Sequence, residues 1–254
     1  MKILCIGDIV GKSGAEMVAS QLKYLKMDYE IDFVIANGEN CTTGNGINRQ
    51  RADLLLEAGV DVITMGNHTF SKREVIQLFE EDYPILRPLN LQRGTPGKGY
   101  LIKSAVGRKI AVINLIGRAF MQPCDCPFLA AQDCIEKLAA DLVFVDFHAE
   151  ATSEKKAMGW FLNGSATCVF GTHTHVQTAD ECILNKKTAY ITDIGMTGPE
   201  QSVLGIKTDI AVRRFLTMMN ERYEIAEGNC SLCGIIVTVN DENQAIKIER
   251  LEIK

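Results

Sequence analysis

The sequence predicts an α/β protein built on a largely parallel sheet. Short apolar runs rich in β-branched residues alternate with amphipathic helical patterns from the first residues onward, which is the pattern of βαβ units. The length of 254 residues, the 46% hydrophobic content and the 23% charged content are typical of a globular protein with a sizeable core. No linker, internal repeat or low-complexity segment interrupts the pattern, so we expect one domain over residues 1–254.

The first half of the chain alternates strands and helices. Apolar runs predict strands at residues 2–7, 32–37 and 60–65. Helices are expected at residues 14–25 and 49–57, separated by a polar, glycine-bearing loop at residues 42–48. Ser71 followed by Glu74 has the spacing of a capping box, which predicts a further helix beyond it.

The second half begins less regularly. A strand at residues 84–90 and a Gly/Pro loop at 92–99 precede a predicted hairpin of residues 99–103 and 109–115. The remaining strands are expected at 142–147, 166–170, 187–192, 234–239 and 245–251, and the remaining helices at 128–139, 153–162 and 208–219. Residues 123–127 and 193–198 are expected to be loops.

Charge and hydropathy exclude two classes of protein. No apolar run reaches the roughly 18 residues that a membrane-spanning helix needs, and the first strand pattern begins at residue 2. We therefore expect a cytoplasmic protein with no membrane partner. The net charge of -5 argues against long nucleic acid as a partner, because phosphate binding needs clustered Lys and Arg. A small anionic substrate remains compatible if a metal supplies positive charge.

The nine cysteines are an odd number, which fits a secreted disulfide framework poorly. Cys5, Cys134 and Cys168 lie inside apolar runs, where a reduced thiol behaves as a small hydrophobic side chain. The two close pairs allow two interpretations, a four-thiolate zinc site or unconnected thiols; these pairs are Cys124 with Cys126 and Cys230 with Cys233.

The strand at residues 166–170 ends at a glycine that is followed by two histidines, in the order Gly171-Thr172-His173-Thr174-His175. In an extended or loop backbone, residues two apart point to the same side, so both imidazoles can face one point. Imidazole is the commonest protein ligand for transition metals. On this stretch alone, metal ligands and two ordinary loop histidines remain open alternatives.

Polar side chains follow the other apolar strands in the same way. The residues at strand ends are Asp8, Glu39, Asn40, Asn67, His68 and His148, together with His173 and His175. Taken singly, Asp8 could cap a helix and His148 could be a hydrogen-bonded histidine at a sheet edge. Ligands bind beyond the carboxyl ends of parallel strands, so these residues are expected to meet. Their number exceeds what one metal needs and indicates a binuclear site.

These residues resemble the five ordered blocks of the calcineurin-like metallophosphoesterases, which read DxH, GDxxD, GNH[DE], H and GHxH. The matching stretches here are Asp8, Gly38-Glu39-Asn40, Gly66-Asn67-His68, His148 and Gly171-Thr172-His173-Thr174-His175. The chain departs from the pattern at Val10, Glu39, Thr69 and the inserted Thr172. With residues 146–155 and 192–199, it is similar to the bacterial 2',3'-cyclic-nucleotide 2'-phosphodiesterase subfamily, over most of its length.

The resemblance implies a four-layer α/β/β/α sandwich with a metal site at the C-terminal strand ends. It implies one metal on Asp8, Glu39, Asn40 and His175 and a second on Glu39, Asn67, His148 and His173, so that Glu39 is the bridge. The metals are expected to be iron, with manganese as the alternative. Asn40 is expected to compensate for the histidine that Val10 replaces.

The resemblance also implies the reaction. A metal-bridging hydroxide is expected to attack phosphorus in line, and His68 to protonate the departing ribose oxygen as general acid. Release of the 2' oxygen from a 2',3'-cyclic nucleotide would give a 3'-nucleotide. Residues 120–128 or 92–99 are expected to contact the nucleobase, although Phe120 and Phe128 also fit a place in the core.

Two other functions are kept as alternatives. The same metal centre could serve a phosphomonoesterase or an RNA nuclease, and a substrate panel would separate these enzymes. The chain could instead be a regulatory protein that binds a cyclic nucleotide with little turnover. We expect a homo-oligomer, without a prediction of its size.

Overall fold

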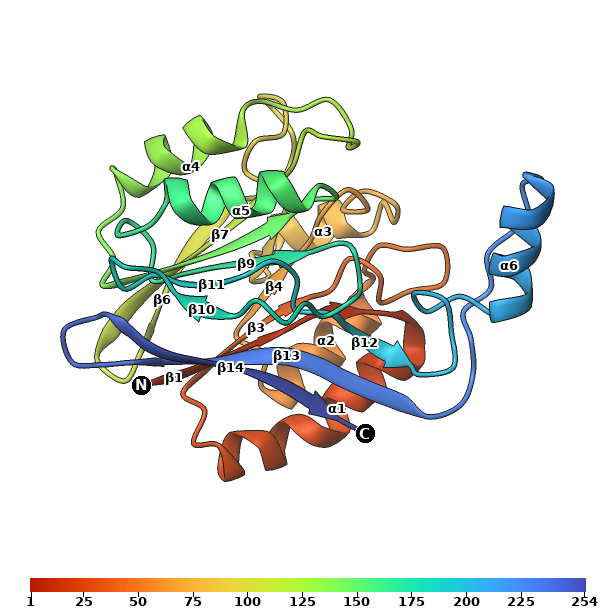
Figure 1. Ribbon diagram of the computed structural model, residues 1–254, viewed down its shortest axis with the longest axis horizontal. Helices are drawn as coiled ribbons and strands as arrows, with labels where there is room; N and C mark the ends of the chain where they lie inside the picture. The colour runs from red at the N-terminus through yellow and green to blue at the C-terminus, as the bar shows by residue number, and fades with distance from the viewer.

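The computed structural model describes residues 1–254 and contains two β-sheets and six helices (Figure 1). The prediction of a mixed α/β fold is confirmed. No helix in the chain combines the length and the apolar character needed to cross a membrane. The two sheets face each other, and most of the helices lie on their outer sides (Figure 1).

The first sheet has the strand order β2-β12-β13-β1-β3-β4-β5, with β14 paired to β13. Its strands are β1 (Lys2–Ile6), β2 (Asp8–Ile9), β3 (Phe33–Asn37), β4 (Val62–Thr64), β5 (Ile85–Leu86), β12 (Met196–Pro199), β13 (Cys230–Val239) and β14 (Ala245–Ile253). The run β1-β3-β4-β5 is parallel as expected. The late strand β13 pairs antiparallel with β1, so the C-terminal part of the chain lies in the middle of this sheet.

The second sheet has the order β10-β11-β9-β8-β7-β6. Its strands are β6 (Tyr100–Ala105), β7 (Arg108–Ile116), β8 (Leu142–His148), β9 (Cys168–Thr172), β10 (Cys182–Ile183) and β11 (Ala189–Ile191). The predicted hairpin is confirmed as the antiparallel pair β6 and β7, and β7, β8, β9 and β11 run parallel.

The helices are α1 (Gly11–Asp28), α2 (Arg49–Ala58), α3 (Val75–Glu80), α4 (Pro127–Ile135), α5 (Thr152–Phe161) and α6 (Thr208–Thr217). Five of them bury an apolar face against a sheet, whereas α6 projects from the body of the molecule (Figure 1). The side chains of Phe215 and Leu216 on α6 are 82% and 80% exposed.

Three apolar cores follow from the alternation of side chains along the strands. Leu4 and Ile6 of β1 face the helix side of the first sheet and pack with Leu22 of α1, whereas Ile3 and Cys5 face the second sheet. A third core lies between the second sheet and the helices α4 and α5. The polar residues at the strand ends therefore lie at the edges of the three apolar cores, close to one another.

Several local expectations were wrong. Ser71 and Glu74 form no capping box, because α3 begins at Val75 and the Glu74 carboxylate instead accepts from the Arg49 backbone N–H at 3.2 Å. The strand expected at residues 84–90 is only two residues long. The expected loop at residues 193–198 contains the start of β12, whose partners β2 and β13 lie far away in sequence.

Candidate metal centre

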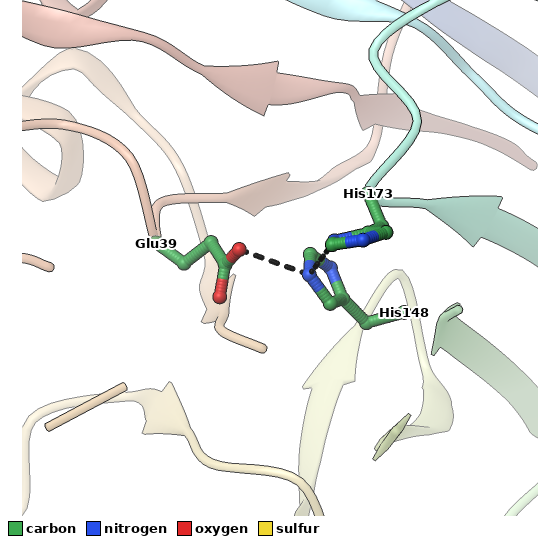
Figure 2. Close-up of side chains that lie close together, drawn as sticks. All are labelled: Glu39, His148 and His173. Atoms are coloured by element: carbon green, nitrogen blue, oxygen red, sulfur yellow. Dashed lines mark hydrogen bonds and ion pairs between the residues drawn. The ribbon is translucent and has the colours of Figure 1, made fainter. Parts of the chain in front are cut away.

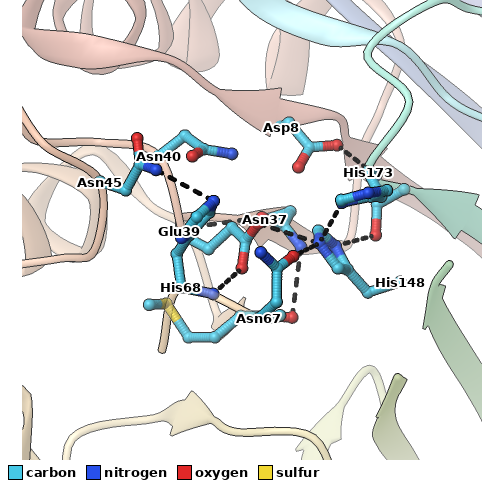
Figure 3. A network of polar contacts seen from close by, with 12 residues as sticks. Asp8, Asn37, Glu39, Asn40, Asn45, Asn67, His68, His148 and His173 are labelled. Carbon is cyan, nitrogen blue, oxygen red and sulfur yellow. Dashed lines mark hydrogen bonds and ion pairs between the residues drawn. The ribbon is translucent and has the colours of Figure 1, made fainter. Parts of the chain in front are cut away.

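The structure brings all the predicted site residues to one place, where both sheets present the carboxyl ends of their strands (Figure 3). Asp8 begins β2, and His148 ends β8. Glu39 with Asn40 follows β3, Asn67 with His68 follows β4, and the two paired histidines follow β9. The meeting of parallel strand ends explains why residues 165 positions apart, such as Asp8 and His173, are in contact.

His148 is the hub of the buried part of this group (Figure 2). Its Nε2 atom lies 2.9 Å from Glu39 Oε1, 3.0 Å from Asn67 Oδ1 and 3.0 Å from His173 Nδ1. Candidate ligand atoms of Glu39, His148 and His173 all lie within 4.8 Å of one another, and no other group of three His, Cys, Asp or Glu residues in the chain does so. The cysteines of the two close pairs are therefore not in such a group, and all nine thiols are free.

The hydrogen bonds behind His148 identify its protonation. Thr172 Oγ1 donates to Asp146 Oδ1 at 2.7 Å, so toward His148 Nδ1, 2.9 Å away, the same hydroxyl acts as acceptor. His148 therefore carries its proton on Nδ1 and presents a lone pair at Nε2. That lone pair faces the oxygens of Glu39 and Asn67, which also are acceptors. Lone pairs that converge on one point repel one another unless a cation lies between them. The chemistry of these side chains therefore fits a metal ion.

A second group of contacts lies beside the first. The buried Asp8 accepts the His173 backbone N–H at 3.0 Å through Oδ2, while its Oδ1 has no hydrogen-bond partner. His175 Nε2 lies 3.7 Å from Asp8 Oδ1 and 3.4 Å from the Asn40 amide. An unpartnered buried carboxylate oxygen is costly unless a cation occupies the adjoining space. The contacts thus place His173 with His148 and His175 with Asp8 and Asn40.

Burial sets the protonation of these groups. Desolvation lowers the pKa of His148 to about 4, and desolvation together with the neighbouring His148 lowers the pKa of His173 to about 4. Both rings are therefore neutral at physiological pH, which is the form that binds metals. Burial also raises the pKa of the Asp8 and Glu39 carboxyls above their ordinary values. In the absence of a cation, burial therefore disfavours the charged forms of these two carboxyls.

Gly66 allows these side chains to come together. A Cβ atom at this position would lie 2.4 Å from His148 Nε2 and 2.5 Å from Glu39 Oε2, closer than any real contact. Any other residue would push the imidazole and the carboxylate apart. The glycine before Asn67 is thus required by the close approach of its backbone to the donors, and not by a positive φ angle.

The loop that carries the paired histidines is held in a strained conformation. His173 has φ 95° and His175 has φ 63°, a region that side chains with a Cβ rarely adopt. Asp193 Oδ2 accepts from the Thr174 backbone N–H at 3.1 Å and from its hydroxyl at 2.7 Å. Lys155 Nζ lies 2.7 Å from the same oxygen, and both charged side chains are buried. This buried ion pair fixes the residue between the two histidines.

Lys155→Met is expected to lower the free energy of unfolding by about 3–5 kcal/mol, because it leaves Asp193 buried without its counter-ion. Urea unfolding of the chelator-treated protein measures this loss. Lys156→Met is the matched control: Lys156 pairs with Asp180 at the surface, and its removal is expected to cost about 1 kcal/mol or less. Equal losses in the two variants would contradict the role of the buried pair.

His68 lies at the wall of the cavity beside this group and is fixed at both ends. Its backbone N–H donates to Glu39 Oε2 at 2.9 Å, and its Nε2 lies 2.9 Å from the amide nitrogen of Asn45. The ring makes no contact with His148 or His173 among the hydrogen bonds of the structure. His68 is therefore placed next to the donors without being one of them (Figure 3).

Four residues of the site escaped prediction from the sequence. Asn45 holds His68, Glu150 Oε2 lies 3.1 Å from His173 Nε2, and Thr172 with Asp146 orients His148. Asp146 accepts further bonds from Thr64 and Asn37, yet burial raises its pKa to about 7. The signals were present but weak: Asn45 lies in a polar loop with glycines, and Asp146 interrupts an apolar strand.

Two facing sheets with carboxylate, amide and imidazole side chains at their strand ends resemble the arrangement of the calcineurin-like metallophosphoesterases. The chain belongs to the family described as YmdB-like protein, whose model matches residues 4–251.

Two relatives match this chain over nearly their whole length, and a third matches its fold. The chain is 47% identical to the 2',3'-cyclic-nucleotide 2'-phosphodiesterase of Bacillus subtilis, covering 100% of this chain and 97% of that protein. A crystal structure described as a novel phosphatase of Mycoplasma pneumoniae superposes with a TM-score of 0.94 at 38% identity, over 100% of this chain and 93% of that one. The fold also matches the NAD nucleotidase of Haemophilus influenzae, with a TM-score of 0.63 at 15% identity over 99% of this chain and 55% of that one.

Proposed function

We propose that this protein is a binuclear-metal phosphodiesterase that hydrolyses 2',3'-cyclic nucleotides to 3'-nucleotides. The observation that carries the proposal is the convergence of acceptor atoms around His148 Nε2, which a cation would stabilise, beside a cavity of about 390 Å³. A cavity of this size is at the small end of pockets for small-molecule ligands. The activity named for the Bacillus subtilis relative supports the substrate.

The proposed metal ligands follow the two groups of contacts. Asp8, Glu39, Asn40 and His175 would hold one metal, and Glu39, Asn67, His148 and His173 would hold the other. Glu39 is then shared by both. Oxygen and imidazole donors without thiolate suit iron, with manganese as the alternative. Asn40 takes part with its amide oxygen turned toward the metal.

The residues of the chain have distinct parts in the proposed reaction. Two such ions would supply a hydroxide near neutral pH and positive charge beside the phosphoryl oxygens. His68 would deliver a proton to the departing ribose oxygen, and its Nε2 can donate that proton when the Asn45 amide turns its oxygen toward the ring. Asn45 keeps the ring at the cavity wall, and the bond from the His68 backbone to Glu39 fixes the acid relative to the shared carboxylate. Glu150 orients His173 through its outer nitrogen.

The decisive experiment is a substrate panel on the metal-loaded protein, with the position of phosphate on the product determined by NMR. The proposal expects 3'-AMP from 2',3'-cAMP, and much slower hydrolysis of 3'-AMP and of short RNA. Faster cleavage of 3'-AMP would replace the proposal by a phosphomonoesterase, and faster cleavage of RNA by a nuclease. Tight binding of 2',3'-cAMP without product would indicate a regulatory protein.

The proposal includes the wider organisation of the molecule. We take residues 1–254 as one domain in which the three apolar cores separate the four layers of an α/β/β/α sandwich. The odd number of cysteines supports a reducing, cytoplasmic location. The exposed apolar side chains of α6 support a homo-oligomer of this chain. Light scattering measures the mass in solution, and a monomer would contradict this last point.

Thr172→Val is expected to weaken metal binding about 10- to 100-fold, because the hydroxyl that orients His148 and links it to Asp146 is lost. Competition with a chromophoric chelator measures the affinity without any turnover. Thr188→Val is the matched control, since this buried hydroxyl donates to the Ala166 carbonyl and touches no proposed ligand. An unchanged metal affinity in Thr172→Val would refute the positioning role.

A further inference from the structure

The cavity beside the proposed metal centre has two unlike walls. One wall is formed by the donors and by His68, Asn45 and Glu150. The remaining wall is apolar or aromatic, and its side chains are Val10, Leu204, Ile206, Tyr223 and Ile225. A phosphate needs only the first wall. The second wall offers an apolar surface that could contact another, apolar part of the substrate.

The apolar wall is a paired backbone unit at the base of α6. Ile206 forms antiparallel bridges with both Val203 and Ile225. The Ala226 N–H donates to the Gly205 carbonyl at 2.9 Å, and the Lys207 N–H to the Glu224 carbonyl at 2.9 Å. Residues 203–207 and 224–226 thus hold each other in place, and we call them, together with the adjoining Tyr223, the apolar wall segment. Leu204, Ile206 and Ile225 line the cavity from this paired backbone.

The apolar wall segment lies directly against the donors. The Leu204 carbonyl oxygen is 3.1 Å from His175 Nδ1 and therefore accepts the proton of that ring. Gly205, with φ +93°, lets the backbone approach Val10 so closely that a Cβ would lie 2.5 Å from Val10 Cγ1. The polar and apolar walls are consequently neighbours within one cavity. A small molecule with a phosphate at one end and a flat apolar group at the other spans both.

Tyr223 is the aromatic side chain of this wall. The guanidinium carbon of Arg214, on α6, lies 4.5 Å from the centre of the Tyr223 ring. The guanidinium covers one face of the ring in a cation–π interaction, and the other face remains for stacking. Bases stack on aromatic side chains with little dependence on sequence, because every base has a π face.

We propose that the apolar wall segment is the nucleobase subsite, with Tyr223 stacking on the base and Ile206 and Ile225 flanking it. This inference rests on the proposed cyclic-nucleotide function and adds the part of the site that selects a nucleoside over a bare phosphodiester. It replaces the expectation that residues 120–128 or 92–99 contact the base, because neither segment lines the cavity. Phe120 is 90% exposed, and Phe128 packs edge-to-face on Phe147 and Phe161.

The test measures binding and not turnover. Calorimetry on the manganese-loaded protein gives the affinity for 3'-AMP and, separately, for inorganic phosphate. Tyr223→Ala is expected to weaken 3'-AMP binding roughly 5- to 150-fold, the range of one stacked base, and to leave phosphate binding and metal content unchanged. Tyr223→Phe is expected to bind as the wild type does. Tyr24→Ala, an exposed tyrosine on α1, is the matched control and is expected to change neither affinity.

The outcomes distinguish this inference from the proposed function. Unchanged 3'-AMP affinity in Tyr223→Ala, or an equal loss for 3'-AMP and phosphate, overturns the subsite. If the wild type binds 3'-AMP no more tightly than phosphate, the subsite is also overturned, even where the panel shows diesterase activity. Conversely, a base-dependent affinity that is lost in Tyr223→Ala supports the subsite, whereas an absence of 2',3'-cAMP turnover in the same preparation counts against the proposed reaction alone.

Discussion

Glu39→Ala is expected to lose both metals and to lower phosphodiesterase turnover by about 10³-fold or more, since even one electrostatic contact to the reacting group supplies about 10²- to 10³-fold. Glu39 is the only carboxylate that contacts His148 and also fixes the backbone of His68. Its removal therefore disturbs the shared ligand and the general acid together. Elemental analysis after purification and single-turnover kinetics measure the two effects.

The stability of the metal-free protein makes this prediction sharper. Burial raises the pKa of Glu39, so its charged form is unfavourable where no cation is present. The chelator-treated Glu39→Ala protein is thus expected to unfold at the same or a higher urea concentration than the chelator-treated wild type. A merely structural carboxylate predicts the reverse. Glu57→Ala, at an exposed position of α2, is the control and should change neither metal content nor turnover. Full metal occupancy in Glu39→Ala would refute the shared-ligand role.

His68→Ala is expected to keep its metals and to lose about 10²- to 10⁴-fold in the hydrolysis of 2',3'-cAMP, the usual contribution of a general acid. The ribose oxygen leaves as a strongly basic alkoxide unless it is protonated. A p-nitrophenolate needs no such help, because it is a stable anion. The same variant is therefore expected to hydrolyse bis(p-nitrophenyl) phosphate at nearly the wild-type rate, and the ratio of the two rates isolates proton delivery from binding.

Asn45→Ala tests the residue that holds His68 in place, separately from the general acid itself. Asn45 touches His68 Nε2 and no proposed ligand, so its loss is expected to lower cyclic-nucleotide turnover less than His68→Ala does, with the metals retained. Equal hydrolysis of both substrates by wild type and His68→Ala would leave the imidazole without a catalytic part. Loss of metal in His68→Ala would instead place this ring among the ligands.

The sequence allowed the parallel run of the first sheet and the donors at its strand ends to be predicted because both are local. Glu39 and Asn67 each follow an apolar run directly, and parallel strands bring such ends to one edge. The outer partners could not be predicted in this way. Thr172 meets Asp146 only because β8 and β9 are neighbours in a particular register, in which His148 is opposite Thr172. That register depends on packing across the whole sheet.

The apolar wall was missed for a related reason. Tyr223 and Ile225 lie in a segment without a helical or strand pattern, and its partner Ile206 is on the other side of α6. Neither segment carries a chemical motif, and each becomes part of the site only through backbone pairing. The aromatic residues that did attract attention, at positions 120 and 128, are conspicuous in sequence but lie away from the cavity.

The antiparallel pairing of β1 with β13 has a consequence for how the chain is made. Lys2 is opposite Thr238, so one edge of β1 stays unpaired until the much later β13 has been synthesised. β13 also separates β1 from β12, the strand that pairs with Asp8. The part of the sheet that carries Asp8 therefore has all its neighbouring strands only once β13 is present. Contacts this distant in sequence slow folding, and the nascent protein must keep its apolar edge from aggregating during that interval.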